Sequence, residues 1–349
     1  MYSLIRPLLF RLEPERAHDL SLRLVRAAGR IPVSERLLTA LFTVRDPRLE
    51  VEAFGLRFHN PVGLAAGYDK NGIAVKGLAA LGFGHIEVGT VTRRAQPGNP
   101  RPRVHRLPAS RALINSMGFP NAGVEALRVE RGPARIGINL GRSRETPPER
   151  AAEDYCALLE RVHLGADYVA INISSPNTPG LRSLQNRAAL EELLGAVARA
   201  RANLAPRPPV LVKIAPDLTE AEIDDVLAAI TAHGMDGVIA TNTTVRREGI
   251  PARFTGLTGG WSGAPLGARA TAVVRYIARQ TRGALPIVGV GGILSAADAL
   301  EKLRAGATLI QVYTGLIYAG PGLAREINRG LLQECERDGV QSVTELRAG

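Results

Sequence analysis

The chain of 349 residues carries a net charge of +11, and 45% of its residues are hydrophobic and 22% charged. This length allows one large domain or two ordinary ones, and the composition is that of a soluble globular protein. Two cysteines, Cys156 and Cys335, exclude a disulfide framework and a cysteine-based metal site, and we expect both to pack within helices in a reducing compartment. The six histidines show no paired metal-ligand spacing, so no metal is expected.

The excess of positive charge leaves nucleic acid, an anionic membrane surface and an anionic ligand as possible partners. The basic residues are spread along the chain, and aromatic residues make up only 4% of it, so few bases would find a stacking partner. We therefore expect no nucleic-acid partner. Only four of the 44 basic residues are lysines. Lys70 and Lys213 belong to strand-like regions, whereas Lys76 and Lys302 are interpreted as ordinary surface positions of helices.

Residues 1–45 predict a small helical segment in front of a main domain that covers 46–349. Apolar residues recur at helical spacing from Leu4 to Leu12, a second helix is expected over 14–28 with Gly29 as its stop, and a third over 34–43. None contains the roughly 20 apolar residues needed to span a bilayer. We expect no signal peptide, because charges interrupt every apolar run. The segment suits either an amphipathic unit on a membrane surface or helices packed on the main domain.

Residues 47–60 predict a short hairpin, and eight strand-like apolar runs follow it. Near-continuous apolar runs indicate parallel strands that are buried on both faces. Eight such runs, alternating with helical stretches, predict an α/β fold of the (β/α)8 TIM-barrel type, with a doubly wound open sheet as the alternative. The insertions at 92–133 and 244–285 have the length of lids or binding loops. The expected strands are 61–67, 84–91, 135–141, 168–175, 210–216, 237–243, 286–292 and 309–315.

Small or hydrogen-bonding residues stand at the end of every expected strand. The carboxyl ends of barrel strands meet at one mouth, where barrel enzymes have their active sites. A purely structural barrel would have no use for two lysines and several amides at such a mouth. The glycines of 289–292 and Thr314 match the usual barrel phosphate site, which predicts a phosphate-bearing cofactor. Lys213 would stabilise negative charge on a reduced ring.

The chain resembles the quinone-dependent (class 2) dihydroorotate dehydrogenases over essentially its whole length. The resemblance implies an FMN-containing barrel that oxidises (S)-dihydroorotate to orotate in pyrimidine (UMP) biosynthesis and passes electrons to a membrane quinone. Ser175 stands where this family has its catalytic base, whereas the soluble class 1 enzymes carry cysteine there. Ser116 and Tyr68 depart from residues common in the family. The matching stretches are 65–70, 86–91, 96–99, 171–180, 212–217, 240–244 and 289–293.

The resemblance also implies a binding role for individual residues. The residues expected to hold FMN are Ala66, Gly67, Thr90, Asn139, Asn172, Lys213, Thr241, Gly263, Gly292, Tyr313 and Thr314. Those expected to hold the substrate are Lys70, Asn115, Ser116, Met117, Gly118, Phe119, Asn172, Asn177, Asn242 and Thr243. His18 and Arg106 are implied near the quinone.

The N-terminal helical segment, which class 1 enzymes lack, favours class 2. It implies that residues 1–45 associate with the quinone and with the membrane, so that the protein is peripheral on the cytoplasmic face of the cell membrane. Two other functions remain as alternatives. A flavin barrel enzyme that modifies tRNA would be expected to use a cysteine acid at its site, and a non-catalytic phosphate-binding barrel would leave Ser175, Lys70 and Lys213 without a role.

Overall fold

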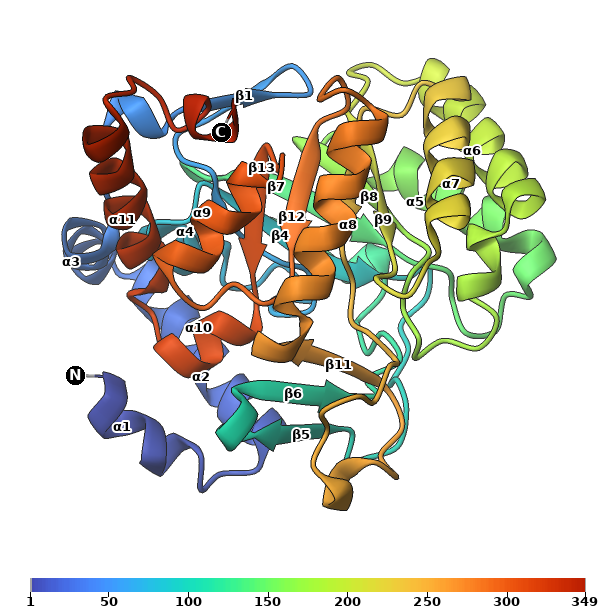
Figure 1. The fold of residues 1–349 in the computed structure, drawn as a ribbon. Helices are drawn as coiled ribbons and strands as arrows, with labels where there is room; N and C mark the ends of the chain where they lie inside the picture. Colours follow the sequence, from blue (N-terminus) through green and yellow to red (C-terminus); the bar gives the residue numbers. More distant parts are fainter. Residues whose placement is uncertain (1, 349) are drawn as a thin grey trace.

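Eight of the apolar runs form parallel strands that pair side by side into a closed barrel, as predicted, and this excludes the open doubly wound sheet (Figure 1). The computed structural model describes residues 2–348. The barrel closes in the order β10-β12-β13-β3-β4-β7-β8-β9. Its strands are β3 (Val62–Leu64), β4 (His85–Val91), β7 (Arg135–Leu140), β8 (Tyr168–Asn172), β9 (Val210–Ile214), β10 (Gly237–Ala240), β12 (Ile287–Val290) and β13 (Leu309–Val312).

Helices surround the barrel and bury their apolar faces against it. The second strand is an exception to the predicted βα rhythm, because no α-helix follows β4 before β7 begins. Prolines recur through the segment that would form this helix, and each removes a backbone donor. The helices after the barrel strands are α4 (Val75–Ala80), α5 (Ala151–Val162), α6 (Arg187–Ala202), α7 (Glu220–Ala232), α8 (Gly267–Gln280), α9 (Ala296–Arg304), α10 (Thr314–Ala319) and α11 (Leu323–Asp338).

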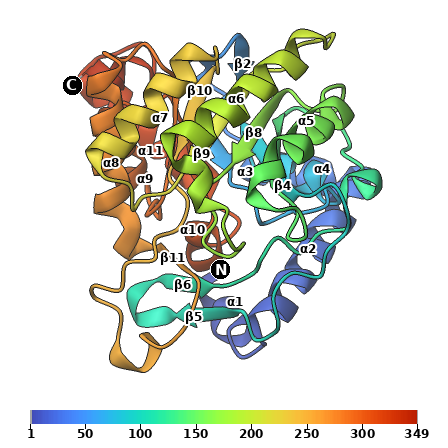
Figure 2. The same cartoon turned by 90° about the vertical axis from the view of Figure 1, so that its right-hand side faces the viewer.

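The two long insertions meet in a small antiparallel sheet next to the barrel. This sheet has the order β11-β6-β5, and its strands are β5 (Val104–Leu107), β6 (Ala112–Asn115) and β11 (Gly260–Gly263). It has a separate core that includes Ile114 and Trp261. Both views place this sheet beyond one end of the barrel, with α1 and α2 beside it (Figures 1 and 2). The insertions therefore cover one end of the barrel.

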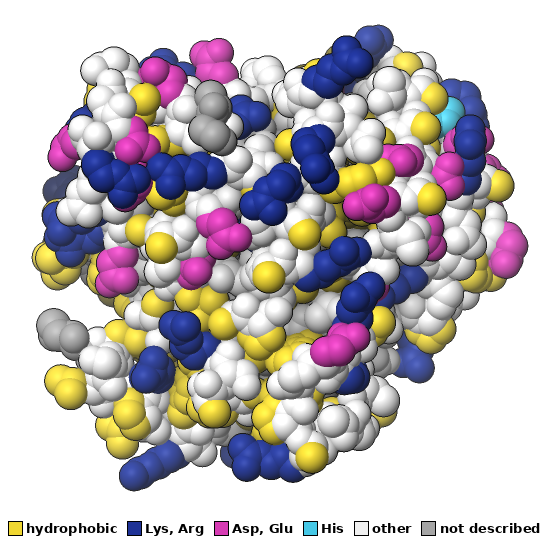
Figure 3. Space-filling model, viewed as in Figure 1, with side chains coloured by type: hydrophobic (Ala, Val, Ile, Leu, Met, Phe, Trp, Pro, Cys, Tyr) yellow, Lys and Arg dark blue, Asp and Glu magenta, His cyan; other side chains and the backbone are white. Residues whose placement is uncertain are grey.

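The N-terminal segment forms three helices, α1 (Tyr2–Leu9), α2 (Pro14–Arg30) and α3 (Pro32–Phe42). The helix α2 ends at Arg30, one residue after the expected stop at Gly29. A Cβ on Gly29 would lie 2.2 Å from the backbone nitrogen of Gly77 in α4, so the glycine allows close packing of two helices. Leu4 and Leu8 of α1 are 79% and 60% exposed, and Figure 3 shows hydrophobic and basic side chains mixed in this region. None of the helices within residues 2–348 has the length and apolarity to cross a membrane.

Two further predictions for local structure are confirmed. Residues 47–60 contain a hairpin of β1 (Val51–Ala53) and β2 (Leu56–Phe58), with positive φ angles at Phe54 and Gly55 in its turn. Cys156 is half-buried on α5 and Cys335 is buried on α11, and both pack against the main hydrophobic core.

His85, the first residue of β4, is fully buried at the end of the barrel away from the insertions. Its ring lies 5.5 Å from the ring of Phe58 and 6.3 Å from that of Tyr168, centroid to centroid. Neither ring nitrogen has a hydrogen-bond partner within residues 2–348. Burial lowers the pKa of His85 to about 4, although the nearby Glu87 opposes this shift. The folded protein therefore holds His85 neutral.

We expect His85 to make the protein less stable in mild acid. In the unfolded chain His85 becomes protonated below its ordinary pKa of 6.5, whereas in the folded protein it stays neutral down to about pH 4. The stability that His85 contributes is therefore complete above pH 6.5 and falls by about 3 kcal/mol as the pH approaches 4. The free energy of unfolding should be measured in urea for wild type and His85→Leu between pH 7 and 4. Over this range it should fall by about 3 kcal/mol less in the variant than in wild type. Parallel pH profiles for the two proteins would contradict the prediction.

Candidate active site

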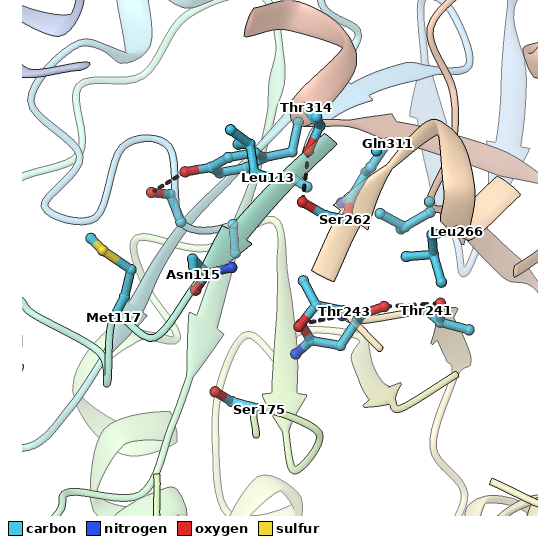
Figure 4. Close-up of a pocket in the computed structure, with 18 of the residues that line it drawn as sticks. Leu113, Asn115, Met117, Ser175, Thr241, Thr243, Ser262, Leu266, Gln311 and Thr314 are labelled. Atoms are coloured by element: carbon cyan, nitrogen blue, oxygen red, sulfur yellow. Dashed lines mark hydrogen bonds between the residues drawn. The ribbon is translucent and has the colours of Figure 1, made fainter. Parts of the chain in front are cut away.

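A cavity opens at the C-terminal ends of the barrel strands, under the β5–β6–β11 sheet. Figure 4 shows Asn115, Ser175, Thr243 and Ser262 around it, each from a different segment. It contains about 1150 Å³ of space, part of it open to solvent. The predicted residues that line it are Ala66, Gly67, Lys70, Thr90, Asn115, Met117, Gly118, Phe119, Asn172, Ser175, Asn177, Lys213, Thr241, Asn242, Thr243, Gly263, Gly292, Tyr313 and Thr314.

Asn139 and Ser116 were predicted for the same site and do not line the cavity. Asn139 lies directly behind it: the Nδ2 of Asn172 donates to the Oδ1 of Asn139 at 3.0 Å and to the Oγ1 of Thr90 at 3.1 Å. Both asparagines are buried. Asn139 therefore fixes the orientation of the amide that reaches the cavity.

Ser175 lies on the loop that follows β8, with only 5% of its surface exposed. Its Oγ accepts a hydrogen bond from the backbone N–H of Asn177 at 3.3 Å. The side-chain amide of Asn177 donates in turn to the Oδ1 of Asn115 on β6 at 3.0 Å. These hydrogen bonds thus link the loop that carries Ser175, across the cavity, to the β5–β6–β11 sheet.

Arg182, which no sequence pattern marks as functional, also positions this loop. Its guanidinium donates to the backbone oxygen of Ser174 at 3.0 Å, to that of Thr243 at 2.9 Å and to the carboxylate of Asp217 at 2.8 Å. These partners belong to the segments after β8, β10 and β9. One side chain therefore holds three loops of the mouth together.

Lys70 lies between this cavity and a second one, and it lines both. Its Nζ donates to the backbone oxygen of Gly67 at 2.7 Å. Burial lowers the pKa of Lys70 to about 8, while the carboxylates of Glu15 and Asp19 oppose the shift. Most of the lysine is still protonated at neutral pH, so it offers a positive charge to an anionic ligand.

The glycine-rich turn after β12 forms the opposite wall. Gly291 and Gly292 have φ angles of 116° and 76°, and a Cβ on Gly292 would lie 2.1 Å from the Cα of Gly267. Only glycine fits such a conformation at such a close approach. The hydroxyls of Ser262 and Thr314 are 2.8 Å apart beside this turn. Backbone N–H groups and hydroxyls in this arrangement suit a phosphate group.

Glu87, in the middle of β4, is the centre of a buried polar network that the sequence analysis missed. It is 0% exposed. Its Oε1 accepts from the Nζ of Lys213 at 3.1 Å and from the Nδ2 of Asn139 at 2.8 Å. Its Oε2 accepts from the Nε2 of Gln311 at 2.9 Å and faces the hydroxyl of Tyr168 at 3.5 Å. The available signal was an acid inside an apolar strand, because such a group needs partners when it is buried.

Lys302 is not a surface residue, and the interpretation of it as one is wrong. It is 1% exposed, and its Nζ donates to the Oγ1 of Thr271 at 2.7 Å. Its alkyl stem covers Gly289 of β12, where a Cβ would lie 2.5 Å from the Cγ of Lys302. Burial lowers the pKa of Lys302 to about 8. Lys76, by contrast, is exposed and pairs with Glu130 at 3.5 Å.

A second cavity lies between the N-terminal helices and the barrel mouth, with about 2020 Å³ of space, part of it open. His18 and Arg106 both line it. Burial, together with the charge of Lys70, lowers the pKa of His18 to about 3, so its ring is neutral. The ring of Tyr68 lies 4.9 Å from that of His18 and 6.1 Å from that of Tyr313. These aromatic rings connect the second cavity to the first.

The fold and the first cavity define a (β/α)8-barrel enzyme whose site lies at the C-terminal mouth. Within residues 2–348, no group of three or more His, Cys, Asp or Glu side chains is arranged to hold a metal ion. A model of the dihydroorotate dehydrogenase family matches residues 48–335. The chain therefore belongs to the dihydroorotate dehydrogenase family, and it is an oxidoreductase.

Relatives and solved structures agree with this membership. The chain is 53% identical to a protein of Roseiflexus castenholzii named dihydroorotate dehydrogenase (quinone), over 99% of this chain and 95% of the relative. A protein of the same name from Acidithiobacillus ferrooxidans is 52% identical, over 99% and 98%. The crystal structure of Eimeria tenella DHODH in complex with ferulenol superposes with a TM-score of 0.88 at 36% identity and covers 97% of each chain.

Proposed function

We propose that the protein is a quinone-dependent (class 2) dihydroorotate dehydrogenase that uses FMN to oxidise (S)-dihydroorotate to orotate, in the biosynthesis of pyrimidines leading to UMP. The observation that carries this proposal is the first cavity, because it brings together Ser175, Lys70, the asparagine amides and the glycine-rich turn. The names of the similar proteins support the same reaction.

The first cavity fits FMN. A buried polar atom in its wall, the Oε1 of Gln311, has no partner within residues 2–348 and is free for the polar ring of the cofactor. Bound FMN would supply the acceptor for a hydride from the substrate. The turn at Gly291 and Gly292 and the hydroxyl of Thr314 would hold its phosphate, and Lys213 would face its ring. The other residues proposed to hold it are Ala66, Gly67, Thr90, Asn172, Thr241, Gly263 and Tyr313, and Asn139, which lies behind the cavity wall, would contribute by orienting Asn172.

The substrate needs donors for its carboxylate and ring amide groups, and the cavity offers Lys70 and four asparagine amides. Their orientations are fixed, since Asn177 bonds to Asn115, and the Nδ2 of Asn242 bonds to the Oγ of Ser174 at 3.0 Å. Fixed donors cost less ordering free energy when the substrate binds. The residues proposed to hold the substrate are Lys70, Asn115, Met117, Gly118, Phe119, Asn172, Asn177, Asn242 and Thr243, and Ser116, which lies outside the cavity wall, would contribute only by joining Asn115 to Met117.

Ser175 is proposed as the base that takes the proton from C5 of dihydroorotate while a hydride leaves C6. A serine hydroxyl is a weak base, so its developing negative charge must be stabilised and its own proton passed on. The backbone N–H of Asn177, 3.3 Å from the Oγ, stabilises such a charge. Thr178, buried two residues before Gly180, is the proposed relay together with a water molecule, and Phe119 would exclude bulk solvent.

The second cavity is proposed as the quinone site, with His18 and Arg106 in its wall. Residues 1–45 would then form a unit that binds quinone and touches the membrane surface, while residues 46–349 form the catalytic barrel. The exposed leucines of α1 support this contact with lipid. The protein would lie on the cytoplasmic face of the cell membrane. The tRNA-modifying alternative is not supported, because Cys156 and Cys335 both lie outside the cavity wall, on α5 and α11.

An anaerobic spectrum tests the proposal. The purified protein should show the visible band of oxidised flavin, and added dihydroorotate should bleach it. A quinone should restore the band and fumarate should not. A flavin band that dihydroorotate leaves unchanged would refute the substrate, and a protein without flavin would refute the cofactor.

A further inference from the structure

Glu87 is placed to control the charge at the wall of the first cavity. Its carboxylate has no exposed surface, whereas its partner Lys213 lines the cavity. The two side chains form an ion pair at 3.1 Å, with 0% and 6% of their side-chain surfaces exposed. In an interior shielded from water, each charge acts strongly on its surroundings. The electrostatic potential at this part of the cavity is therefore set by both charges together, and the negative charge of Glu87 offsets part of the positive charge of Lys213.

The hydrogen bonds around Glu87 hold its carboxylate in place beside Lys213. Its four neighbours, Lys213, Asn139, Gln311 and Tyr168, come from four other strands of the barrel. Lys213 is the only one of these four that carries a positive charge. The remaining groups satisfy the carboxylate oxygens without compensating the charge. Loss of the carboxylate would thus leave one unpaired positive charge beside the cavity.

We propose that Glu87 is a positioning residue that holds the Lys213 ammonium at the cavity wall and, by partly neutralising it, keeps the reduction potential of the bound flavin low. This inference rests on the proposed function. Hydride transfer from dihydroorotate brings two electrons and one proton, and therefore one unit of negative charge, to the cofactor. An ammonium without a partner would favour that charge more strongly than the ion pair does. The pair therefore leaves the cofactor ready to give its electrons to a second acceptor.

The variant Glu87→Gln removes the charge with little change in shape. Its amide oxygen can still accept from Lys213 and Asn139, and its new NH2 group would face the amide of Gln311. The Oε1 of Gln311 has no partner within residues 2–348. A flip of this amide would turn Oε1 toward the new donor, so we expect the barrel to fold. The same flip would turn the NH2 group of Gln311 toward the cavity, and Glu87→Asp and Lys213→Met, which need no flip, therefore separate the effect of the charge from this local change.

The test measures the midpoint potential of the flavin by equilibration with a reference dye, under anaerobic conditions. Glu87→Gln should raise the potential, Lys213→Met should lower it, and the double variant should return toward wild type. Glu125→Gln is the matched control, because Glu125 lies on the surface in an ion pair with Arg161, and its potential should equal that of wild type. The dissociation constant of FMN from each apoprotein should be measured alongside.

An unchanged or lowered midpoint potential in Glu87→Gln would overturn the proposal. The proposal would also be overturned if the variant lost part of its flavin and the flavin that stayed bound had the wild-type potential. If Glu87→Gln does not fold, Glu87→Asp and Lys213→Met carry the test. The aspartate variant should keep a potential near that of wild type, and an unchanged potential in Lys213→Met would overturn the proposal. Failure of the proposed function has a different signature, since wild type itself would then lack flavin or fail to be bleached by dihydroorotate.

Discussion

Ser175→Ala is expected to keep its flavin and to lose about 10²- to 10⁴-fold of the rate of flavin reduction by dihydroorotate, the usual contribution of a positioned proton acceptor. The side chain reaches the cavity and donates no hydrogen bond within the described part of the chain. Its removal therefore takes away the proton acceptor and leaves the cofactor wall in place. Stopped-flow absorbance of the flavin band gives this rate directly.

Ser183→Ala is the matched control for this variant. Ser183 lies on the same loop, exposed, where its hydroxyl donates to the backbone oxygen of Gly180 at 2.7 Å. Dihydroorotate should reduce the flavin of Ser183→Ala at the wild-type rate. Near-normal reduction in Ser175→Ala would contradict the assignment of the base. A loss of flavin from Ser175→Ala would show instead that the residue holds the cofactor.

Glu15→Ala is expected to lower the free energy of unfolding by about 3–5 kcal/mol, because it removes one partner of a buried ion pair. Glu15 of α2 is 6% exposed and Arg103, just before β5, is 5% exposed. The guanidinium of Arg103 contacts the carboxylate at 3.0 and 3.1 Å and also donates to the backbone oxygens of Pro97 and Asn99. The variant leaves this cation buried without its counter-charge. Urea unfolding measures the loss.

Glu50→Ala serves as the control, because Glu50 pairs with Arg57 on the surface, where such a bond contributes about 1 kcal/mol or less. Equal destabilisation by the two variants would contradict the prediction. We also expect Glu15→Ala to lower the rate at which quinone reoxidises the flavin, because Glu15 lines the second cavity. Its carboxylate also favours the protonated form of Lys70, which lines both cavities, so the variant should weaken substrate binding as well.

The barrel and most of the site could be predicted because the relevant patterns are local. An apolar run that ends in a polar residue marks both a buried strand and its carboxyl end, and parallel pairing brings all such ends to one mouth. Asn172 and Ser175 could therefore be assigned to the mouth from the chain alone. The same reasoning would have reached Glu87, an acid inside the apolar strand β4.

The features that the sequence did not reveal depend on partners far along the chain. Gly29 lies near the end of α2 as expected, but the sequence does not show that it packs closely against Gly77 of α4. Lys302 has charged neighbours on α9, and its burial depends on the space above Gly289. The pairing of β6 with β11 joins segments between which four of the eight barrel strands lie in the chain. No local period encodes such contacts.

The two cavities have one wall in common, formed by Lys70, Val104, Leu113, Met117, Pro120 and Tyr313. A substitution at any of these positions alters the wall of both cavities at once. Residues of α1 and α2 such as Ile5 and Leu9 border the second cavity alone. With the second cavity as the proposed quinone site, changes in the first two helices would alter the fit of the electron acceptor and leave every side chain that lines only the barrel mouth unchanged.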